Sequence, residues 1–277
     1  MNTKTPLIGI QGAQGSYHHQ VARACFGETA SFLECMRFDQ LLQELFQGGC
    51  DFAVMALENS IAGSILPNYA LIDRMEGVII GEYHLSVQHQ FMGLSGQTIA
   101  DIQEVRSHPM ALLQCQEFLA QYPHIRLVEA DDTAAVAQQI AQKSLSGVAA
   151  IASAEAARLN GLEVLAPTIQ TIKNNVTRFV VVAKDRADSP EKFNKASLKL
   201  TLDHKRGSLA TILNVLSDCQ MNLTKIQSLP VIETPGKYAF FIDVTFEEPS
   251  AFHKAESILS LMATSFKILG TYSQIHD

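Results

Sequence analysis

Short apolar runs alternate with amphipathic stretches over the first two thirds of the chain. Runs such as residues 6–10 and 52–57 predict buried strands, whereas residues 38–46 carry apolar side chains at helical spacing and predict a helix. Alternation of this kind is typical of parallel sheets that helices cover on both faces. The full prediction is strands at 6–10, 31–35, 52–57, 102–106, 125–129 and 147–151, with helices at 16–26, 38–46, 110–122 and 133–142.

Residues 78–94 interrupt this order with a pattern that alternates in part between apolar and polar side chains. The pattern suits strands that cross from one subdomain to another. We therefore predict a two-lobed α/β domain with a central cleft over residues 1–183.

The composition changes at residues 184–196, which are polar and charged, contain a proline and predict a linker. Residues 197–277 then show the order strand, helix, strand, strand, helix, strand. That order predicts a βαββαβ, ferredoxin-like domain. Such a sheet leaves one face and an edge to be covered, and a second copy would cover them, so we expect a homodimer or homotetramer.

The composition and charge exclude several classes of partner. The chain has 277 residues, of which 47% are hydrophobic, and a net charge of -7. An acidic surface repels polyanions, so nucleic acid is not an expected partner. No apolar run is long enough to cross a membrane, and the N-terminus lacks the pattern of a secretory signal. The five cysteines are scattered and form no C-x-x-C pair, which predicts reduced thiols in a cytoplasmic protein.

Three junctions place glycine or small polar residues where a predicted strand ends, at residues 12–17, 58–63 and 107–109. In open parallel sheets, ligands bind at the carboxyl ends of strands, where helix N-termini offer free N–H groups and a partial positive charge. Together the junctions predict a cleft for a small anion. The alternative is that their Ser and Asn residues are only helix caps and turn residues.

The hexapeptide NNVTRF at residues 174–179 opens a further apolar strand. Side chains alternate along a strand, so Thr177 and Phe179 point one way and Arg178 points the other. A bend at the start of the strand would let both faces reach the cleft. There, Arg178 would offer a bidentate cation to a carboxylate, and Thr177 would offer a neutral donor and acceptor.

No motif for a metal or an organic cofactor accompanies these residues. The nine histidines lack the spacing of a metal site, and no G-x-S-x-G elbow occurs. Gly12 and Gly15 lack the further residues of a phosphate loop or a dinucleotide fingerprint. The residues alone therefore predict a protein that binds small anions, and they do not define a reaction.

Several motifs, in this order, resemble the prephenate dehydratase family over about residues 6–183. They are GAQGSY at 12–17, ENS at 58–60, SHPMALLQC at 107–115, GL at 161–162 with Ala166, and NVTRF at 175–179, which includes the signature threonine, arginine and phenylalanine of the family. The segment from about residue 197 to 274, with RGSL at 206–209 and NLTKIQSLP at 222–230, resembles the ACT regulatory domain of the same family.

The resemblance implies a periplasmic-binding-protein-like catalytic domain, a linker and an ACT domain. It implies a carbon-oxygen lyase that converts prephenate to phenylpyruvate, water and carbon dioxide in L-phenylalanine biosynthesis, with no metal or organic cofactor and with feedback by L-phenylalanine. The catalytic residues would be Thr177, Arg178, Phe179, Asn175, Asn59, Ser60 and Ser107. The substrate-binding residues would be Glu58, Gln11, Gly12, Ser16, Tyr17 and His108. The effector-binding residues would be Gly207, Ser208, Leu209, Gln227, Ser228 and Leu229.

Physical reasoning suggests a role for each residue of the signature triplet. Thr177 would assist the departing hydroxide, Arg178 would hold a carboxylate and Phe179 would exclude water. The two carboxylates of prephenate would otherwise be poorly oriented in the cleft.

Three alternatives stay open at this point. The family usually shows Glu-Ser-Arg-Pro where this chain reads QSLP at residues 227–230, so both charges of that motif are missing. Weak inhibition by phenylalanine, a different effector or altered coupling would each fit this change. Arogenate is the alternative substrate, because it differs from prephenate only in an amino group that replaces the keto oxygen. A non-catalytic sensor of small anions or amino acids is the alternative to an enzyme.

Overall fold

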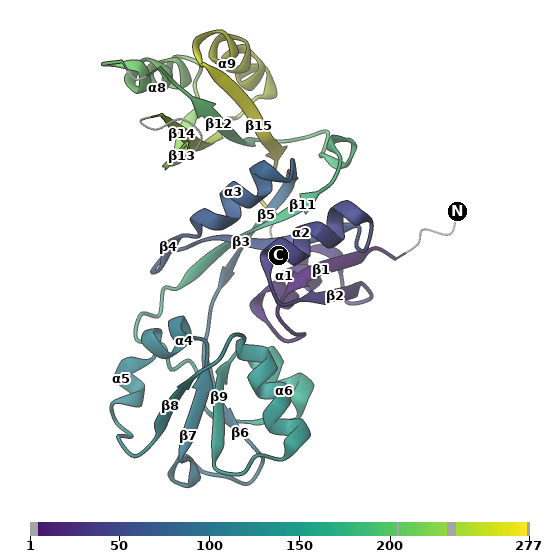
Figure 1. Ribbon diagram of the computed structural model, residues 1–277, viewed down its shortest axis with the longest axis vertical. Helices are drawn as coiled ribbons and strands as arrows, with labels where there is room; N and C mark the ends of the chain where they lie inside the picture. The colour runs from purple at the N-terminus through teal and green to yellow at the C-terminus, as the bar shows by residue number, and fades with distance from the viewer. Residues whose placement is uncertain (1–4, 204, 232–236, 276–277) are drawn as a thin grey trace. The chain divides into compact units, whose positions relative to one another are not determined.

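The computed structural model describes residues 5–203, 205–231 and 237–275 (Figure 1). Within them, the chain folds into two compact units. The first unit contains the chain up to Ile65 together with Tyr83–Phe179, and the second contains Leu66–Glu82 together with the chain from Val180 onward. Neither unit is continuous in sequence. The sequence-based limits of two domains at 1–183 and 197–277, with a linker at 184–196, stay a prediction.

A six-stranded sheet has the strand order β2-β1-β3-β11-β5, with β4 paired to β3. Strand β1 pairs in parallel with both β2 and β3, and helices α1 and α2 connect these strands. Parallel neighbours end at the same edge of a sheet, so the loops that follow β1 and β3 begin close together. The bounds are β1 (Leu7–Gln11), α1 (Tyr17–Phe26), β2 (Ser31–Cys35), α2 (Phe38–Gln47), β3 (Phe52–Asn59), β4 (Gly63–Ser64), β5 (Val78–Ser86) and β11 (Val176–Ala183).

A five-stranded sheet has the order β10-β6-β9-β7-β8. Strand β7 pairs in parallel with β8 and β9, whereas β6 pairs in antiparallel fashion with β9 and β10. Its strands are β6 (Gln90–Gly93), β7 (Glu104–Ser107), β8 (Arg126–Glu129), β9 (Val148–Ala152) and β10 (Glu163–Ala166). Its helices are α4 (Pro109–Gln114), α5 (Gln116–Leu119), α6 (Thr133–Lys143) and α7 (Ala154–Asn160).

Helices cover both faces of the five-stranded sheet. They bury the side chains of its central strand β9, which is apolar throughout. Ala150 and Ala152 pack with residues of α6 and α7, whereas Ala149 and Ile151 pack with residues of α4 and α5. Figure 1 shows α6 on one side of this sheet and α4 and α5 on the other. The α/β class predicted from the continuous apolar runs is therefore confirmed.

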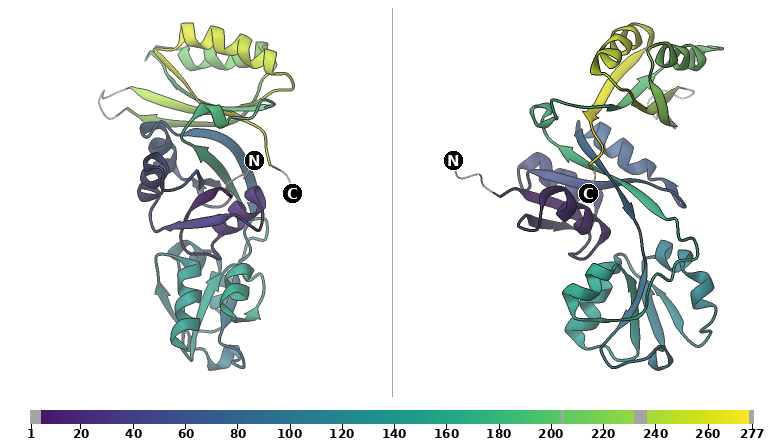
Figure 2. Two further views of the ribbon diagram at one scale, coloured as in Figure 1. Left: turned by 90° about the vertical axis from the view of Figure 1, so that its right-hand side faces the viewer. Right: turned by 180° about the vertical axis from the view of Figure 1, so that it is seen from behind.

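The βαββαβ order predicted for the C-terminal part is also confirmed. Its strands lie in the order β13-β14-β12-β15, and each neighbouring pair is antiparallel. Helices α8 and α9 lie on the same face of this sheet (Figures 1 and 2). The bounds are β12 (Lys195–Thr201), α8 (Ser208–Asp218), β13 (Asn222–Pro230), β14 (Tyr238–Thr245), α9 (Pro249–Met262) and β15 (Ser265–Tyr272).

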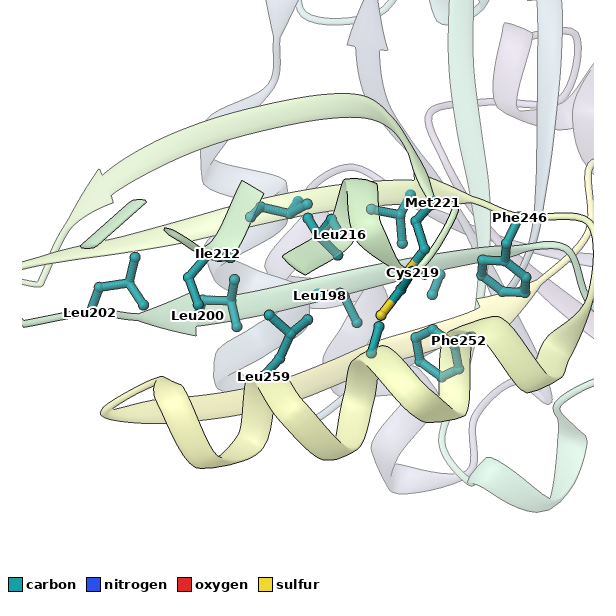
Figure 3. Packing of buried hydrophobic residues seen from close by; sticks show 14 residues of the cluster. Leu198, Leu200, Leu202, Ile212, Leu216, Cys219, Met221, Phe246, Phe252 and Leu259 are labelled. Atoms are coloured by element: carbon teal, nitrogen blue, oxygen red, sulfur yellow. The ribbon is translucent and has the colours of Figure 1, made fainter. Parts of the chain in front are cut away.

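Period-two alternation in β12 builds the core beneath these helices. Leu198 and Leu200 point toward Ile212 and Leu216 of α8 and toward Leu259 of α9 (Figure 3). All five side chains are buried, and each contributes roughly 2 kcal/mol through the loss of its contact with water. The residues on either side of Leu198 in β12, Ser197 and Lys199, consequently face the opposite side of the sheet.

Helix α3 (Leu66–Arg74) packs against that opposite side. The carboxylate of Asp73 near its end accepts hydrogen bonds from the Nζ atoms of both Lys199 and Lys267. Burial would raise the pKa of Asp73, but the two ammonium groups outweigh burial and hold this pKa below its usual value. Because the pKa is lowered in the folded state, this carboxylate stabilises the fold above the pKa of an unfolded aspartate, and the contribution is lost as the pH falls below it.

Two further contacts join the segment 66–82 to the sheet. The Tyr69 ring packs edge-on against Phe241 at 5.6 Å, and the Lys195 ammonium lies 2.7 Å from Glu82 Oε1 in a buried ion pair. Helix α3 of the same chain thus lies against part of the face that a second copy was expected to cover. The edge-strand argument is unaffected, and the homodimer or homotetramer stays a prediction.

Some elements differ from the prediction. Helices α3 and α7 and strand β10 were not predicted, because each is short and its apolar positions show no extended period. The helix predicted at 110–122 is divided by Cys115, whose backbone φ of -109° leaves the helical region. Short 3-10 turns occur at Ile99–Asp101 and Arg186–Asp188. None of the helices within the described ranges has the length and apolarity needed to span a membrane.

Substitution of Glu82 tests the contribution of the buried ion pair. In Glu82→Gln, the Lys195 ammonium stays buried without its carboxylate, so we expect the free energy of unfolding to fall by about 3 kcal/mol. Urea unfolding followed by circular dichroism measures this change. The control is Asp203→Asn, which removes the partner of Lys205 in an exposed pair and should change stability by less than about 1 kcal/mol. Equal effects of the two substitutions would contradict the prediction.

Candidate active site

A cavity of about 430 Å³ lies within the first unit and is lined by residues from both of its sheets. The loops after β1 and β3 and the start of β11 contribute from the six-stranded sheet, while α4 and the segment after β8 contribute from the five-stranded sheet. This position, at the ends of parallel strands, is where the sequence predicted a cleft. Seven of the proposed site residues line the cavity: Gln11, Ser16, Tyr17, Asn59, His108, Thr177 and Phe179.

Other proposed site residues do not line the cavity but contact residues or strands that form its wall. Asn175 is fully buried and hydrogen-bonded to Asn59, which does line it. Ser60 closes the β3–β4 turn onto the next strand, since its Oγ accepts from Val176 N at 2.9 Å. Ser107 donates to the carbonyl oxygen of Ile151 at 2.6 Å. These contacts indicate residues that shape the walls.

Two charged candidates occupy strand positions next to residues of the cavity. Arg178 is buried, and it is absent from the described lining although its neighbours Thr177 and Phe179 belong to it. This is the alternation expected along a strand. Glu58 is half-buried and pairs with Ser64 in the β3–β4 hairpin. A direct contact of either residue with a ligand stays a prediction.

The side-chain amide of Asn59 has only one orientation that satisfies its surroundings. Its Oδ1 accepts from the backbone N–H groups of Ile61 at 3.0 Å and Ala62 at 2.8 Å. Backbone nitrogens can only donate, so Nδ2 of Asn59 must be the atom that faces the other way. From there it donates to Asn175 Oδ1 at 2.6 Å and to Thr177 Oγ1 at 2.8 Å.

This orientation of Asn59 determines which atoms donate and which accept in the hydrogen-bond network that continues through Asn175, Gln114 and His89. Because Asn175 Oδ1 accepts from Asn59, its Nδ2 is the donor to Gln114 Oε1, at 2.9 Å. The same oxygen lies 3.0 Å from His89 Nε2, which must therefore carry a proton. In a neutral imidazole Nδ1 is then an acceptor, and it lies 2.8 Å from the hydroxyl of Tyr17, whose single proton is also within 3.0 Å reach of the Gln88 carbonyl oxygen.

Burial keeps the side-chain rings of His89 and Tyr17 in this hydrogen-bond network uncharged at neutral pH. It lowers the pKa of His89, although the hydrogen bond with Gln114 acts in the opposite direction. Burial also raises the pKa of Tyr17, and the Cys115 thiol acts in the same direction. At neutral pH the network therefore consists of neutral donors and acceptors with defined directions.

Thr177 ends this network at the cavity. Its Oγ1 already accepts a hydrogen bond from Asn59, and no described residue accepts the hydroxyl proton of Thr177. A ligand oxygen in the cavity is then the natural acceptor for that proton.

Aromatic side chains form the apolar wall beside Thr177. The Phe179 ring meets His18 edge-on at 5.0 Å, and His18 lies 5.4 Å from Phe38. Burial lowers the pKa of His18 to about 3, and its Nε2 accepts from the backbone N–H of Ala56. This histidine is therefore a neutral wall residue.

A buried carboxylate lies at another part of the wall. Asp132 caps α6 by accepting from Ala135 N at 2.7 Å, and it approaches the loop after β1 closely. A Cβ atom at Gly12 would lie 2.1 Å from Asp132 Oδ2, so only glycine fits there. Burial raises the pKa of Asp132, against the hydrogen bond from Ala135.

Comparison with known proteins identifies the family. The model of the family described as prephenate dehydratase matches residues 8–187. The chain belongs to the prephenate dehydratase family. One relative, the chloroplastic arogenate dehydratase/prephenate dehydratase 2 of Arabidopsis thaliana, is 34% identical over 278 residues, which cover 96% of this chain and 72% of that protein.

Two solved structures are similar over 96% of this chain. Prephenate dehydratase from Arthrobacter aurescens, in complex with L-Phe, is 26% identical with a TM-score of 0.86 and is covered to 89%. A protein described as a novel type of quorum quenching acylase is 28% identical with a TM-score of 0.85 and is covered to 97%. These two similar structures are described as a dehydratase and as an acylase. The reaction must therefore be inferred from the residues of the site rather than from the fold.

Among the polar residues of the cavity wall, the sequence analysis did not propose His18, His89, Gln114, Asp131, Asp132 and Thr133. Gln114 lies within the SHPMALLQC motif of the family, so its place in that motif was an available signal. His89 and Asp132 lie outside the family motifs quoted above, and the sequence offers no periodicity or spacing that would select them. No group of three or more His, Cys, Asp or Glu residues in the described ranges has the arrangement of a metal site.

The proposed effector residues lie at two places in the second unit. Gly207 precedes α8 in a left-handed conformation, with φ of 85°. Ser208 and Leu209 line a cavity of about 100 Å³ together with Tyr238 and Phe240 of β14. The remaining candidates lie along β13, namely Gln227, Ser228 and Leu229. Their contact with an effector stays a prediction.

The tautomer of His89 tests the hydrogen-bond chain directly. We expect a neutral ring protonated at Nε2 near pH 6.5, because burial lowers the pKa of His89 below that value. Long-range proton–nitrogen correlation spectra of ¹⁵N-histidine-labelled protein distinguish the two tautomers, and His89→Gln assigns the signal. Protonation at Nδ1 alone would contradict the direction derived for the chain.

Proposed function

We propose that the protein is a carbon-oxygen lyase that converts prephenate to phenylpyruvate, water and carbon dioxide, a step of L-phenylalanine biosynthesis. The observation that carries this proposal is the hydroxyl group of Thr177. It lines a cavity of the size of a small ligand, its oxygen is already bonded to Asn59, and its proton is available. Membership of the prephenate dehydratase family supports the substrate class.

The reaction requires two bonds to break on one ring. The bond from C1 to the ring carboxylate breaks, and its electron pair enters the ring as carbon dioxide leaves. The bond from C4 to the hydroxyl oxygen breaks as that oxygen takes the electron pair with it. Because aromaticity supplies much of the driving force, the protein mainly has to orient the substrate and stabilise the departing hydroxide.

Thr177 is well placed to assist that departure. As negative charge develops on the leaving oxygen, the Thr177 hydroxyl donates a hydrogen bond to it, and the amide of Asn59 stabilises the threonine oxygen in turn. Hydroxide takes up a proton to become water, through this hydroxyl or through a bound water. Phe179 excludes solvent from the ring and favours the loss of carbon dioxide from a poorly solvated carboxylate.

The other family residues receive supporting roles in this proposal. Asn175 orients Asn59, and Ser60 and Ser107 hold the backbone that presents the site. Gln11, Ser16, Tyr17 and His108 are proposed to contact the substrate, since they line the cavity. Arg178, from the family signature, is proposed as the carboxylate-binding cation, and this role requires its side chain to turn toward the cavity.

Arogenate is the second candidate substrate, and a specific observation favours it. Asp131 and Asp132 line the cavity, and carboxylates suit an ammonium group. Arogenate carries an ammonium group where prephenate has a keto oxygen. The Arabidopsis relative is named for both activities.

Removal of the Thr177 hydroxyl tests the proposed chemistry. We expect the wild type to turn over prephenate or arogenate, and Thr177→Ala to lower kcat by about 100-fold or more. Product formation is followed by ultraviolet absorbance, and circular dichroism verifies the fold of the variant. Thr29→Ala, at an exposed turn position, is the control and should keep full activity.

Three results would contradict this proposal. Wild-type turnover in Thr177→Ala would remove Thr177 from the chemistry. Binding of both compounds by the wild type without turnover would favour the non-catalytic sensor. Hydrolysis of an N-acyl amide, with no turnover of either ring compound, would favour the chemistry named for the similar acylase structure.

We further propose that L-phenylalanine regulates the enzyme through an ACT domain formed by the βαββαβ part. The small cavity beside Ser208 and Leu209 supports this, as does the L-Phe complex of the Arthrobacter aurescens protein. The missing charges at Gln227 and Leu229 favour weak binding. A cytoplasmic homodimer or homotetramer, without nucleic acid or membrane partners, completes the proposal.

Titration with L-phenylalanine tests the regulatory proposal. We expect turnover to fall as the concentration rises to the millimolar range, and Gly207→Ala to need several-fold more phenylalanine, because alanine is strained at φ of 85°. The matched control is Gly96→Ala, at φ of 82° in the first unit, which should keep the wild-type response. Unchanged activity of the wild type at millimolar phenylalanine would contradict the choice of effector.

A further inference from the structure

Gln114 is a polar residue of the cavity wall whose side-chain N–H groups have no acceptor among the described residues. Its Oε1 accepts from Asn175 Nδ2 at 2.9 Å and from His89 Nε2 at 3.0 Å. In the part of the chain that the structure describes, no residue accepts a hydrogen bond from Gln114 Nε2. Two N–H groups on a half-buried, cavity-lining side chain are thus left for a ligand.

The amide of Gln114 cannot exchange its two ends without loss. If it rotated by half a turn, Nε2 would face the Asn175 Nδ2 donor and that hydrogen bond would be lost, while His89 would have to change tautomer to keep its own. The direction of the Asn175 donor follows from the backbone N–H groups that hold Asn59. The hairpin after β3 therefore determines which atom of Gln114 meets a ligand.

We propose that Gln114 binds a carboxylate of the substrate through Nε2, and that His89 is a positioning residue that holds Gln114 in the binding orientation. The proposal rests on the proposed function, because it assigns one end of the same substrate. Asn59 and Asn175 are hydrogen-bonded to each other, Asn59 is also bonded to Thr177, and Asn175 is also bonded to Gln114. These bonds fix the position of Thr177, which holds the leaving hydroxyl, relative to Gln114, which holds the carboxylate.

The carboxylate bound by Gln114 is the one on the side chain, which the product retains. A hydrogen bond to the ring carboxylate would stabilise that group before it leaves as carbon dioxide and would oppose the reaction. A hydrogen bond to the retained carboxylate acts equally on substrate and product. It therefore lowers KM without requiring any change during the chemical step.

Gln114→Glu is the informative variant because it changes the chemistry while keeping the shape. A glutamate oxygen still accepts from Asn175 and His89, but the second oxygen replaces the donor and repels a carboxylate. We expect KM to rise by about 10- to 100-fold, with a smaller change in kcat. Gln121→Glu is the matched control, since Gln121 is exposed on the same segment, and it should have wild-type kinetics.

Phenylpyruvate serves as the probe of the retained carboxylate, because it lacks the ring carboxylate. Its inhibition constant should rise in Gln114→Glu by about the same factor as KM, and His89→Asn should raise both constants by a smaller factor without changing the fold. An unchanged inhibition constant, or unchanged KM, would overturn the proposal while leaving the proposed function intact. A wild-type chain that turns over neither prephenate nor arogenate would overturn the proposed function and this inference with it.

Discussion

The site depends on one constraint, the pair of backbone N–H groups that hold the side-chain oxygen of Asn59. Backbone amides cannot reverse their polarity, so this contact gives a direction to each hydrogen bond that follows it. Asn175, Gln114 and His89 each accept or donate as a consequence. Neutral side chains can in this way present a donor at Thr177 and a donor at Gln114 in a fixed arrangement.

The fold was largely predictable because its signals are local. Continuous apolar runs identified β1, β3 and β9, and apolar side chains at helical spacing identified α2. Helix α3 was missed because nine residues with a proline near the start carry little periodic signal. Its stability comes from partners far away in sequence, such as Lys199 and Lys267 for Asp73. Tertiary contacts of this kind cannot be read from local pattern.

The candidate site was predictable to a smaller extent, and the reason is separation along the chain. Family motifs identified Thr177, Phe179 and Asn59, which line the cavity. His89 was missed because its partners are distant in sequence: Tyr17 is 72 positions away and Gln114 is 25 positions away. Gln114 in turn meets Asn175, 61 positions away. The hydrogen-bonded groups of the site come from separate elements: Asn59 and Gln114 meet the NNVTRF segment at Asn175, and Asn59 also meets Thr177.

The segment 66–82 has a consequence for how the two units relate as parts of one chain. The segment packs within the second unit. It follows Ile65 directly, and it ends five residues before Val87. Ile65 and Val87 both line the cavity. Truncation of the chain after residue 183 would remove Phe241 from Tyr69, Lys267 from Asp73 and Lys195 from Glu82. The C-terminal module is therefore not a detachable accessory. Its loss would remove contacts of the segment that links two residues of the cavity wall, Ile65 and Val87.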